Sequence, residues 1–585
     1  FLPLMLFNNS CKLLKTLSNN QIKQYSSIGG GHIFKSPWKS IDIPSDKTLS
    51  RLILERVDQF GNEDVNRKAL TCAHSNEVVT FSELSRRIRC VAHGFQSDLG
   101  LKQGESVCIF SPNTVDYPSV FHGALLAGGV VSPVSPQFRV QELVVQIQEA
   151  HAKWVVTVSA LSEIAVEAAS ICGLPASHVI IMDPVSGKHA DQVVSLRKWI
   201  AADNQPDHLP TLEREIDLHN DAHVLPFSSG TTGKPKGVML TSQNLVTNLL
   251  QVDAVESESM SASGRNDVYI GVLPYFHIFA LLVCLNYALF RGVHSPVMSA
   301  FDLPLFLETL QKHKVTVAHI VPPIVVALAK HPIVDKYDLS SLKVLFSGAA
   351  PLSADVENAC AKRLGCTIKQ AWGMSELSPA GALTPTNRIK QGSSGPLVPN
   401  TIAKIVGIPN ANNVDANFIP EYGLGPNEIG EIYIKGPQVM KGYYHREDAT
   451  KESFSSEGFL KTGDTGYIDD DGYVFITDRT KDLIKYKGHQ ISGPELEAIL
   501  LTHDKIADAA VVPSPDEMAG DLPKAFVQLQ QGQTMSEQEV IDFVADQVAP
   551  FKKVRLVEFI DLIPKSPAGK ILRRVLVQQE RERVL

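Results

Sequence analysis

Residues 227–238 carry side chains suited to binding phosphate. This stretch contains four Ser or Thr hydroxyls, three glycines and two lysines, Lys234 and Lys236. Glycine lets a backbone adopt positive φ and approach a ligand closely, and successive N–H groups in such a turn form a concave anion site. Lysine ammonium groups add point charges for phosphate oxygens. The stretch is therefore predicted to bind a phosphate group.

This phosphate-binding stretch is not a Walker A loop, which requires the pattern G-x-x-x-x-G-K-[ST]. Five residues after its first glycine stands Pro235. Residues 223–227 and 237–240 both have the composition of strands, and a helix is expected only after Thr241 or Ser242, either of which can act as N-cap. The sequence therefore predicts a phosphate-binding loop between two strands.

The loop resembles the phosphate loop of the adenylate-forming enzymes, which include acyl-CoA synthetases, 4-coumarate–CoA ligases and luciferases. Further motifs extend the resemblance from about Trp38 to Val575. These motifs lie at residues 273–278, 342–352, 370–376, 461–467, 477–481, 483–490 and 564–571. Among the adenylate-forming enzymes, the chain most resembles the acyl-CoA ligases similar to 4-coumarate–CoA ligase. The resemblance implies that the chain uses ATP and Mg²⁺ to activate a carboxylic acid as an acyl-adenylate, and then transfers the acyl group to CoA.

The resemblance assigns most of these motifs to the nucleotide. The implied nucleotide-binding residues are Ser228, Ser229, Gly230, Thr231, Thr232, Gly233, Lys236, Ala349, Gln370, Ala371, Trp372, Gly373, Ser375, Asp464 and Arg479. Trp372 is expected to stack on adenine, and Asp464 to accept both ribose hydroxyls. Glu376 is expected to hold Mg²⁺, because a hard cation between phosphates prefers a carboxylate. Two positions depart from the family pattern: Trp372 replaces a tyrosine, and Ala371 replaces a glycine and adds a methyl group.

The resemblance also implies that one small domain presents two faces to the site. Lys570 is expected to reach the substrate carboxylate and the α-phosphate during adenylation. After the domain turns about the hinge residue Lys481, a second set of residues is expected to face the site and CoA. That set comprises Lys485, Lys487, Gly488 and Gln490. The implied catalytic residues are Lys570, His277, Lys485 and Gln490.

A substrate pocket is implied beside the nucleotide, with His277 controlling access to it. Its expected lining is His277, Phe279, Val283, Ala349 and Ala371. Coumarate ligases usually carry Tyr at the position of Phe279, and often a small hydroxyl residue or Ala at that of Val283. We therefore expect an apolar pocket that prefers a fatty or plain aryl acid to a hydroxylated one. A luciferase-like monooxygenase acting on an acyl-adenylate is the alternative activity.

These residues must be positioned by more than one domain, because 585 residues exceed a single hydrophobic core. From Ile41 onward strand-like and helical patterns alternate, which predicts an α/β fold. Strands are expected at residues 107–110, 155–158 and 178–182, a helix at 119–127, and a β-barrel subdomain around 405–435. We predict an AMP-binding domain of βα-layered sheets at 41–478, a hinge at 479–482 and a mobile α+β domain at 483–585. The amino-terminal third shows no catalytic constellation.

The composition restricts the classes of partner that the chain is expected to bind. The formal net charge is −8, which does not favour a nucleic-acid surface. Eight scattered cysteines without a C-x-x-C pair favour neither a zinc site nor a disulfide framework. Residues 271–290 lack charged side chains but contain Pro274 and Asn286, so a buried core helix is expected there rather than a membrane span. The partners are then ATP, CoA and a small carboxylic acid, and a monomer is expected.

Residues 1–40 have the composition of a targeting segment. The first 41 residues contain five lysines and no Asp or Glu, and Leu6, Leu13 and Leu17 share one helical face. An acid-poor, amphipathic, Ser-rich segment is typical of a mitochondrial transit peptide, although arginine is missing from it. The chain ends in Arg-Val-Leu rather than the peroxisomal Ser-Lys-Leu. A mitochondrial location is expected, with cytosolic or peroxisomal as alternatives.

Overall fold

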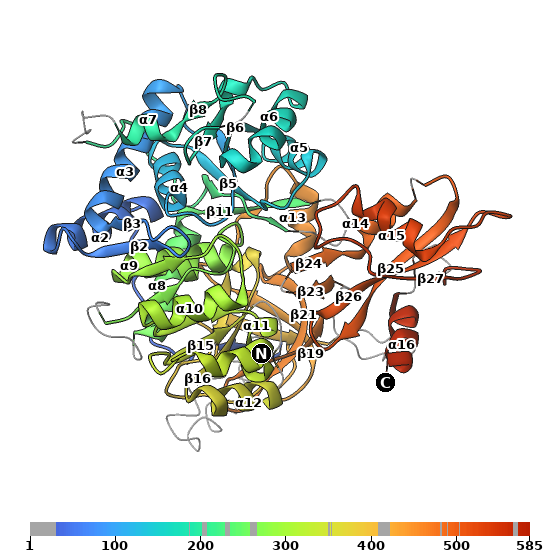
Figure 1. Cartoon of the computed structure of the whole chain (residues 1–585). Coiled ribbons are helices and arrows are strands. Elements are labelled where there is room, and N and C mark those ends of the chain that lie inside the picture. Colours follow the sequence, from blue (N-terminus) through green and yellow to red (C-terminus); the bar gives the residue numbers. More distant parts are fainter. Residues whose placement is uncertain are drawn as a thin grey trace, which may run out of the picture.

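The computed structural model has the predicted mixed α/β architecture, with a large amino-terminal part and a small carboxy-terminal domain (Figure 1). It describes residues 31–186, 188–201, 208–228, 235–257, 266–348, 352, 354–407, 422–479, 483–487, 489–501, 503–564, 571 and 573–584. The predicted hinge residues 480–482 and most of the predicted targeting segment lie outside these residues.

The first large sheet has nine strands, and its centre is parallel. Its order is β10-β11-β9-β5-β4-β6-β7-β8, with β20 paired to β11. The strands are β4 (Ser106–Phe110), β5 (Val130–Val134), β6 (Ala152–Thr157), β7 (Val179–Ile181), β8 (Val194–Ser195), β9 (Ala222–Val224), β10 (Phe227–Ser228), β11 (Lys236–Thr241) and β20 (Gly442–Tyr443). Strands β4 and β5 are buried at every position, as expected for parallel strands covered on both faces.

The helices around this sheet largely match the sequence predictions. They are α2 (Leu49–Glu63), α3 (Phe81–His93), α4 (Tyr117–Leu126), α5 (Val140–Glu149), α6 (Ser162–Ile171) and α7 (Leu196–Ile200), with short turns at Gly94–Asp98, Ser159–Leu161 and Ala176–His178. The helix predicted at 119–127 begins two residues earlier, because Pro118 at its first turn has its φ preset for a helix. Thr241 caps α8 (Ser242–Glu256) through a capping box with Asn244, as predicted.

The second large sheet carries the residues that face the candidate site. Its order is β12-β14-β15-β16-β17, and the first four strands are parallel. The strands are β12 (Tyr269–Ile270), β14 (Val317–Ile320), β15 (Val344–Ser347), β16 (Thr367–Gly373) and β17 (Ala380–Leu383), and the neighbouring helices are α10 (Leu303–His313), α11 (Pro322–Lys330), α12 (Ala354–Leu364) and the turns Pro332–Lys336 and Ser375–Leu377. The motif at 370–376 was expected to follow a strand, but its first four residues are the end of β16.

The uncharged segment 271–290 is buried, as predicted, although its helical part starts late. A π-helix spans Phe279–Asn286 and continues into α9 (Tyr287–Arg291). Seven of the eight π-helical residues are buried, so the segment belongs to the core. In the described part of the chain, no helix is long and apolar enough to cross a membrane.

Two further sheets complete the amino-terminal part. One is antiparallel and has the order β1-β18-β19-β21-β22, with β1 and β22 at its edges; the other has the order β13-β2-β3. Their elements are β1 (Phe34–Lys35), β2 (Lys68–Cys72), β3 (Val78–Thr80), β13 (Ser295–Val297), β18 (Ile402–Val406), β19 (Gly430–Lys435), β21 (Leu460–Ile468), β22 (Val474–Arg479) and the helix α13 (Glu447–Ser453). Where a β-barrel was expected, the described strands thus form a five-stranded antiparallel sheet.

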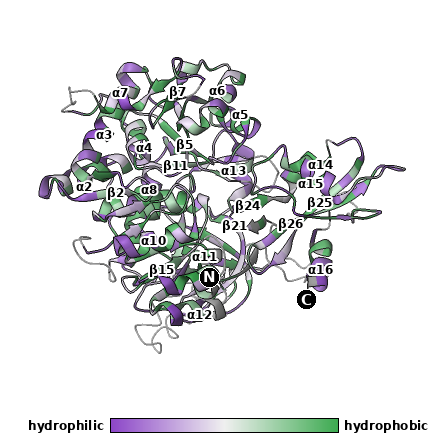
Figure 2. Cartoon of the chain, in the orientation of Figure 1, coloured by the Kyte–Doolittle hydropathy of each residue, from purple (hydrophilic) through white to green (hydrophobic). Residues whose placement is uncertain are grey.

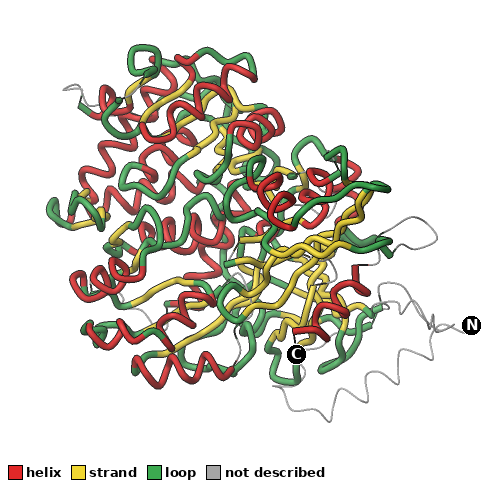
Figure 3. The backbone as a smooth tube through the Cα atoms, turned by 45° about the vertical axis from the view of Figure 1, so that its right-hand side comes forward, coloured by secondary structure: helices red, strands yellow, loops and turns green. Residues whose placement is uncertain are grey.

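The carboxy-terminal domain has its own sheet and core. The sheet order is β24-β23-β26-β25, with β27 beside β26. The elements are β23 (Leu483–Tyr486), β24 (His489–Ser492), β25 (Ile506–Asp516), β26 (Gly520–Leu529), β27 (Leu556–Phe559), α14 (Gly493–Leu500), α15 (Glu537–Ala545) and α16 (Arg573–Val584). A separate hydrophobic cluster that includes Ile484, Leu496 and Val527 lies inside the domain. The sheets of both parts run between helices (Figure 3).

Hydropathy follows this layering. Strands β5 and β7 are mainly hydrophobic, whereas the outer helices α2 and α10 carry many hydrophilic residues (Figure 2). In α2 the buried positions are spaced so that one face of the helix packs inward. Helices therefore cover much of the parallel sheets, and a ligand is expected near the carboxyl ends of their strands.

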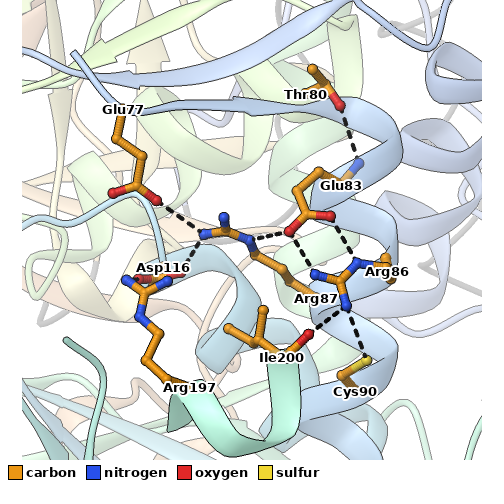
Figure 4. Close-up of polar contacts among 9 residues, drawn as sticks. All are labelled: Glu77, Thr80, Glu83, Arg86, Arg87, Cys90, Asp116, Arg197 and Ile200. Carbon is orange, nitrogen blue, oxygen red and sulfur yellow. Dashed lines mark hydrogen bonds and ion pairs between the residues drawn. The ribbon is translucent and has the colours of Figure 1, made fainter. Parts of the chain in front are cut away.

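A buried ion network fixes the start of α4 (Figure 4). Asp116 accepts from Arg87 at 2.7 Å and from Arg197 at 2.5 Å, so its carboxylate joins α3 and α7 to α4. Glu83 in turn binds Arg87 at 2.8 Å and Arg86 at 2.7 Å. Because the carboxylate of Asp116 is almost fully buried and doubly paired, the network holds the loop before it in one position.

A buried histidine on α4 makes the fold sensitive to acid. His122 is fully buried, and burial together with neighbouring His223 lowers its pKa from 6.5 to about 3. Below pH 6.5 the unfolded chain binds a proton there that the native chain does not, so stability falls as the pH falls. We expect His122→Gln to remove about 1.4 kcal/mol per pH unit from the slope of unfolding free energy between pH 6 and 5. Urea unfolding at several pH values measures the unfolding free energy of both proteins. If that free energy depended on pH equally in wild type and His122→Gln, the prediction would be wrong.

Candidate active site

One large cavity lies between the two parts of the chain and holds most of the predicted site residues that the structure describes. Its volume is about 1130 Å³. From the amino-terminal part it is lined by Ser228, His277, Phe279, Val283, Ala371, Trp372, Gly373 and Ser375, and from the carboxy-terminal domain by Lys487, His489, Phe551 and Lys552. Residues from motifs up to 259 positions apart in the sequence (Ser228 to Lys487) therefore face a single space.

The base of the phosphate loop is tied to the predicted metal ligand. Strands β10 and β11 are antiparallel, and Ser228 pairs with Lys236, so the loop between them joins two strands as predicted. The hydroxyls of Ser228 and Tyr443 lie 3.2 and 2.9 Å from the same oxygen of Glu376, Oε1. Burial and the charge of Glu376 raise the pKa of Tyr443, so it stays a hydrogen-bond donor. The Lys236 ammonium lies 5.1 Å from the centre of the Tyr443 ring.

This arrangement suits a magnesium ion that is bound mainly by phosphates. Within the described residues there is no group of three or more His, Cys, Asp or Glu side chains that could hold a metal. Magnesium in nucleotide sites is usually held by one or two carboxylates together with substrate phosphates and water. Glu376 provides one carboxylate beside the base of the phosphate loop. The hydrogen bonds from Ser228 and Tyr443 both go to its Oε1 atom. The residues present therefore fit Mg²⁺ delivered with ATP.

The predicted adenine and ribose residues contact each other directly. The indole Nε1 of Trp372 donates to Asp464 Oδ2 at 2.9 Å, and both side chains are buried. Gly381 lies against the indole, since a Cβ there would come within 2.7 Å of the ring. The indole N–H of Trp372 thus orients the carboxylate that is predicted to bind the ribose.

The Trp372–Asp464 hydrogen bond gives a testable effect on nucleotide affinity. Trp372→Phe keeps an aromatic ring but removes the donor, and a lost hydrogen bond to a charged group is worth about 1.5–3 kcal/mol at most. We expect the KM for ATP to rise by about fivefold to tenfold, while the KM for CoA stays within twofold. Initial-rate kinetics with each substrate varied in turn measure both, and an unchanged KM for ATP would contradict the role given to this bond.

Gln370 is predicted to bind nucleotide, and in the structure its side chain makes hydrogen bonds within the protein. Its side chain is 6% exposed and makes hydrogen bonds with the backbone of Leu352 at 3.0 and 3.2 Å and with Glu357 at 2.9 Å. These bonds connect β16 to the segment that follows β15. Gln370 therefore holds β16 to Leu352, and both the oxygen and the nitrogen of its amide have hydrogen-bond partners in the protein.

The predicted acyl-pocket residues in the described chain lie together. His277, Phe279, Val283 and Ala371 all line the cavity. The Phe279 ring covers Gly348, where a Cβ would come within 3.0 Å of the ring. The His277 ring is open to the cavity but enclosed by protein, and this burial together with nearby His489 lowers its pKa below 6.5. His277 is thus neutral at physiological pH and can move without carrying a charge.

The carboxy-terminal domain presents its β23–β24 hairpin to this cavity. The hairpin turns at Lys487, which has φ 48° and lines the cavity with His489. The His489 ring stacks on Phe551 at 4.0 Å and lies 6.4 Å from His277. The face predicted to act with CoA is therefore the one that meets the amino-terminal part in this structure.

An ion-pair cluster joins the two parts at the cavity edge. Lys552 lies 3.2 Å from Glu142 of α5 and 2.9 Å from Glu495 of α14, and its ammonium is 4.8 Å from the centre of the Phe138 ring. Burial lowers the pKa of Lys552, but the two carboxylates outweigh it and raise the pKa overall, so the ammonium is charged. Nearby, Arg139 Nη1 donates to the carbonyl of Asp546 at 2.8 Å.

Several predicted residues cannot be compared with the structure. Ser229, Gly230, Thr231, Thr232, Gly233, Lys234, Ala349, Lys481, Gly488 and Lys570 lie outside the described residues. For Arg479, Lys485 and Gln490 the structure describes the backbone: Arg479 pairs with Asp464 across β21 and β22, and Lys485 pairs with Gln490 across the hairpin. Their predicted roles stay predictions.

Sequence reasoning missed residues that help to build the site. Asn113 follows β4 in the supposedly inert amino-terminal third, yet its amide donates to Leu273 O at 2.9 Å and accepts from Tyr275 N at 2.8 Å. It thereby fixes the segment before His277. A lone Asn after a strand gives no sequence signal of its own. Tyr443 and Lys552 were also missed, because each acts through partners distant in sequence.

Comparisons with known proteins show the family of the chain. The AMP-binding enzyme family matches residues 57–444, and the AMP-binding enzyme C-terminal domain matches residues 495–570. The chain is 38% identical over 564 residues to the probable 4-coumarate–CoA ligase 1 of Dictyostelium discoideum, covering 94% of this chain and 98% of that protein. It is 39% identical over 551 residues to 4-coumarate–CoA ligase 1 of Petroselinum crispum, covering 93% and 96%.

Solved structures show the same fold. The amide bond synthetase McbA from Marinactinospora thermotolerans superposes with a TM-score of 0.77 at 24% identity, covering 91% of this chain and 99% of that one. ATP-bound MatB from Rhodopseudomonas palustris gives a TM-score of 0.64 at 26% identity, covering 92% and 100%. With the family matches and the cavity geometry, these findings give one conclusion. The chain belongs to the AMP-binding enzyme family and is an AMP-forming acid–CoA ligase that acts through an acyl-adenylate and uses ATP, Mg²⁺ and CoA.

Proposed function

We propose that this ligase carries out both half-reactions in the cavity between its two parts, with a different face of the carboxy-terminal domain serving each. The observation that carries the proposal is that Lys487 and His489 line the same cavity as Trp372 and Ser375. In the first half-reaction, the substrate carboxylate attacks the α-phosphorus of ATP and pyrophosphate leaves. In the second, the CoA thiolate attacks the acyl carbonyl carbon and AMP leaves.

The protein residues have mainly electrostatic roles in the first step. A carboxylate and a triphosphate repel each other, so catalysis depends on positioning and on neutralising charge. Lys236 and the phosphate loop hold the β- and γ-phosphates, and Lys570 reaches the carboxylate and α-phosphate. Glu376 holds Mg²⁺, which supplies further charge neutralisation when bound. Asp464 and Arg479 hold the ribose, and Trp372 covers the adenine.

In the second step the hairpin face replaces the Lys570 loop. Lys485, Lys487 and Gln490 lie on or beside the hairpin that meets the cavity. Together with Gly488 they position the CoA arm. His277 lies between the hairpin and Phe279 and moves aside as a neutral ring when the thiol enters. The reaction therefore needs the domain to turn about Lys481 once in each cycle.

For the acid, we propose an aryl acid of cinnamate-like size, with a medium-chain fatty acid as the second candidate. The relatives are named for 4-coumarate, and here Phe279, His319 and Phe346 form an aromatic wall along the cavity. A flat aromatic acid stacks on such a wall at little conformational cost. A luciferase-like oxidation gains no support from the relatives named above.

Release of AMP by purified enzyme across a panel of carboxylic acids tests the function. Aryl-propenoic acids should give CoA-dependent AMP release and a thioester product, while pyrophosphate release without CoA should stop after about one turnover. Turnover of fatty acids alone would select the second candidate. Light emission, or AMP release with every acid but no thioester, would overturn the ligase assignment.

We also propose a mitochondrial location and a monomeric state. The location rests on the acid-poor, lysine-containing composition of residues 1–41. A fluorescent protein fused after residue 41 should enter mitochondria, and a fusion to residues 42–585 should not. Light scattering of the purified protein measures the oligomeric state.

A further inference from the structure

His319 is a buried polar side chain in the wall of the cavity, and the described part of the chain offers no partner to its Nδ1 atom. It lies on β14, is 4% exposed and lines the cavity. Its Nδ1 is buried, and within the described residues it has no hydrogen-bond partner. Buried polar atoms in native proteins nearly always have a partner, so this imidazole, which lines the cavity, keeps a hydrogen-bonding capacity that the protein does not use.

The strand register places His319 deeper in the cavity than the nucleotide residues. His319 pairs with Phe346 and Phe346 pairs with Lys369, so these three form one row across the parallel sheet. Two residues further along each strand, Val321, Gly348 and Ala371 form the next row on the same face, and all three line the cavity. Two residues of a strand span about 6.6 Å. Since Trp372 and Gly373 follow at the strand end, His319 lies on the side of the acyl pocket away from the nucleotide.

The surroundings of His319 keep its ring neutral. Burial, and then the nearby positive charge of Lys369, lower its pKa from 6.5 to about 3. Lys369 is itself buried and is paired with Glu256 at 2.5 Å and with Thr386 at 3.0 Å. A neutral imidazole has one N–H donor and one acceptor nitrogen, so it can bind a hydroxyl or a carbonyl oxygen.

The aromatic neighbours restrict where a ligand can meet this ring. The centres of the Tyr269, Phe279 and Phe346 rings lie 5.3, 6.2 and 5.3 Å from the centre of the His319 ring, all in edge-to-face contacts. These rings surround His319 with carbon. A polar ligand atom that reaches this wall can bind the imidazole nitrogens, whereas the Glu256 carboxylate that also lines the cavity is already paired with Lys369.

We propose that His319 determines acyl specificity by hydrogen bonding to a polar atom at the end of the acyl group distal to the carboxylate. The enzyme then selects acids with a distal hydroxyl or carbonyl oxygen over acids of the same shape that end in carbon. This proposal rests on the proposed ligase function. It also revises the expectation from Phe279 and Val283 that the pocket offers only carbon, because the polar partner lies on β14 instead.

Matched pairs of acids test the proposal. One pair is 4-hydroxycinnamate and cinnamate, and a second is 8-hydroxyoctanoate and octanoate, each compared by kcat/KM for AMP release. We expect the wild-type enzyme to prefer the hydroxylated member of at least one pair by about tenfold or more, as a site that hydrogen bonds its ligand rejects the analogue without the group. In His319→Leu the ratio of kcat/KM between the two members of that pair should fall to about one, whatever the change in the rate on both acids. His319→Gln keeps a donor and an acceptor, so part of the preference for the hydroxylated acid should remain.

The outcomes separate failure of this proposal from failure of the ligase function. A wild-type enzyme that turns over both pairs without preferring the hydroxylated acid overturns the role of His319, whichever variants fold. The same holds if His319→Leu keeps the wild-type preference. Absence of acid-dependent AMP release from the wild-type enzyme with all four acids and the wider panel overturns the proposed function instead.

Discussion

Lys570→Ala is expected to slow adenylate formation by about 10²–10³-fold, the scale for losing one preorganised donor at a developing charge. The resemblance to adenylate-forming enzymes places Lys570 on the carboxylate and the α-phosphate, where two anions meet. No other lysine assigned to the site has that position, since Lys236 lies beside Tyr443 at the phosphate loop. Pyrophosphate release in the first turnover, with saturating acid and ATP, measures the effect.

The same variant should retain the second half-reaction. Supplied with synthetic acyl-AMP and CoA, Lys570→Ala should form the thioester at a rate within about threefold of wild type, because the hairpin face of the domain serves that step. Lys565→Ala is a matched control in the same motif and should leave both steps near wild type. Equal loss of both half-reactions in Lys570→Ala would contradict a model in which two faces alternate.

Much of the nucleotide site could be predicted from the sequence, because its chemistry lies in contiguous residues. The two strands that flank the phosphate loop and the helix N-cap at Thr241 or Ser242 are local features; the structure confirms the strand pairing and shows Thr241 as the cap. The uncharged segment 271–290 was predicted as core rather than as a membrane span because it contains Pro274 and Asn286, and its π-helical part is buried. In each case a short run of residue types sufficed to predict the local structure.

What could not be predicted depends on contacts between distant residues. Gln370 lies within a nucleotide motif, yet its amide binds the backbone of Leu352 after another strand. His319 lies in a run of apolar residues that predicts only a buried strand. That its side chain lines the cavity depends on the pairing of β14 with β15, which no local pattern predicts. The apolar pocket was inferred from Phe279 and Val283 alone, because no sequence pattern links them to β14.

The contact between the two parts of the chain is the feature least visible in the sequence, and it governs the second half-reaction. Lys552 and its partners Glu142 and Glu495 are separated by 410 and 57 positions, and the side chain of Lys552 is 9% exposed. An ammonium between two carboxylates at this boundary favours the orientation in which the hairpin meets the cavity. In the proposed cycle, the pair with Glu142 breaks when the domain turns, and water then solvates that carboxylate again.

Lys552→Met is therefore expected to slow thioester formation from synthetic acyl-AMP by about tenfold to a hundredfold. Removing one partner of a fully buried ion pair costs about 3–5 kcal/mol, and solvent access at this boundary reduces the cost to about 1–3 kcal/mol. Pyrophosphate release should stay within threefold of wild type, because adenylation uses the other orientation.

Two further variants separate docking of the domain from direct contact with CoA. Lys553→Met, the matched control one residue away, should leave both rates near wild type. Glu142→Gln leaves Lys552 in place but weakens the attraction across the boundary, and its amide oxygen can still accept the 3.1 Å hydrogen bond from Arg139 N. It should therefore slow thioester formation with an unchanged KM for CoA. A raised KM for CoA in Lys552→Met, together with a wild-type rate in Glu142→Gln, would show that Lys552 binds CoA and does not hold the domain, because only the ammonium would then matter.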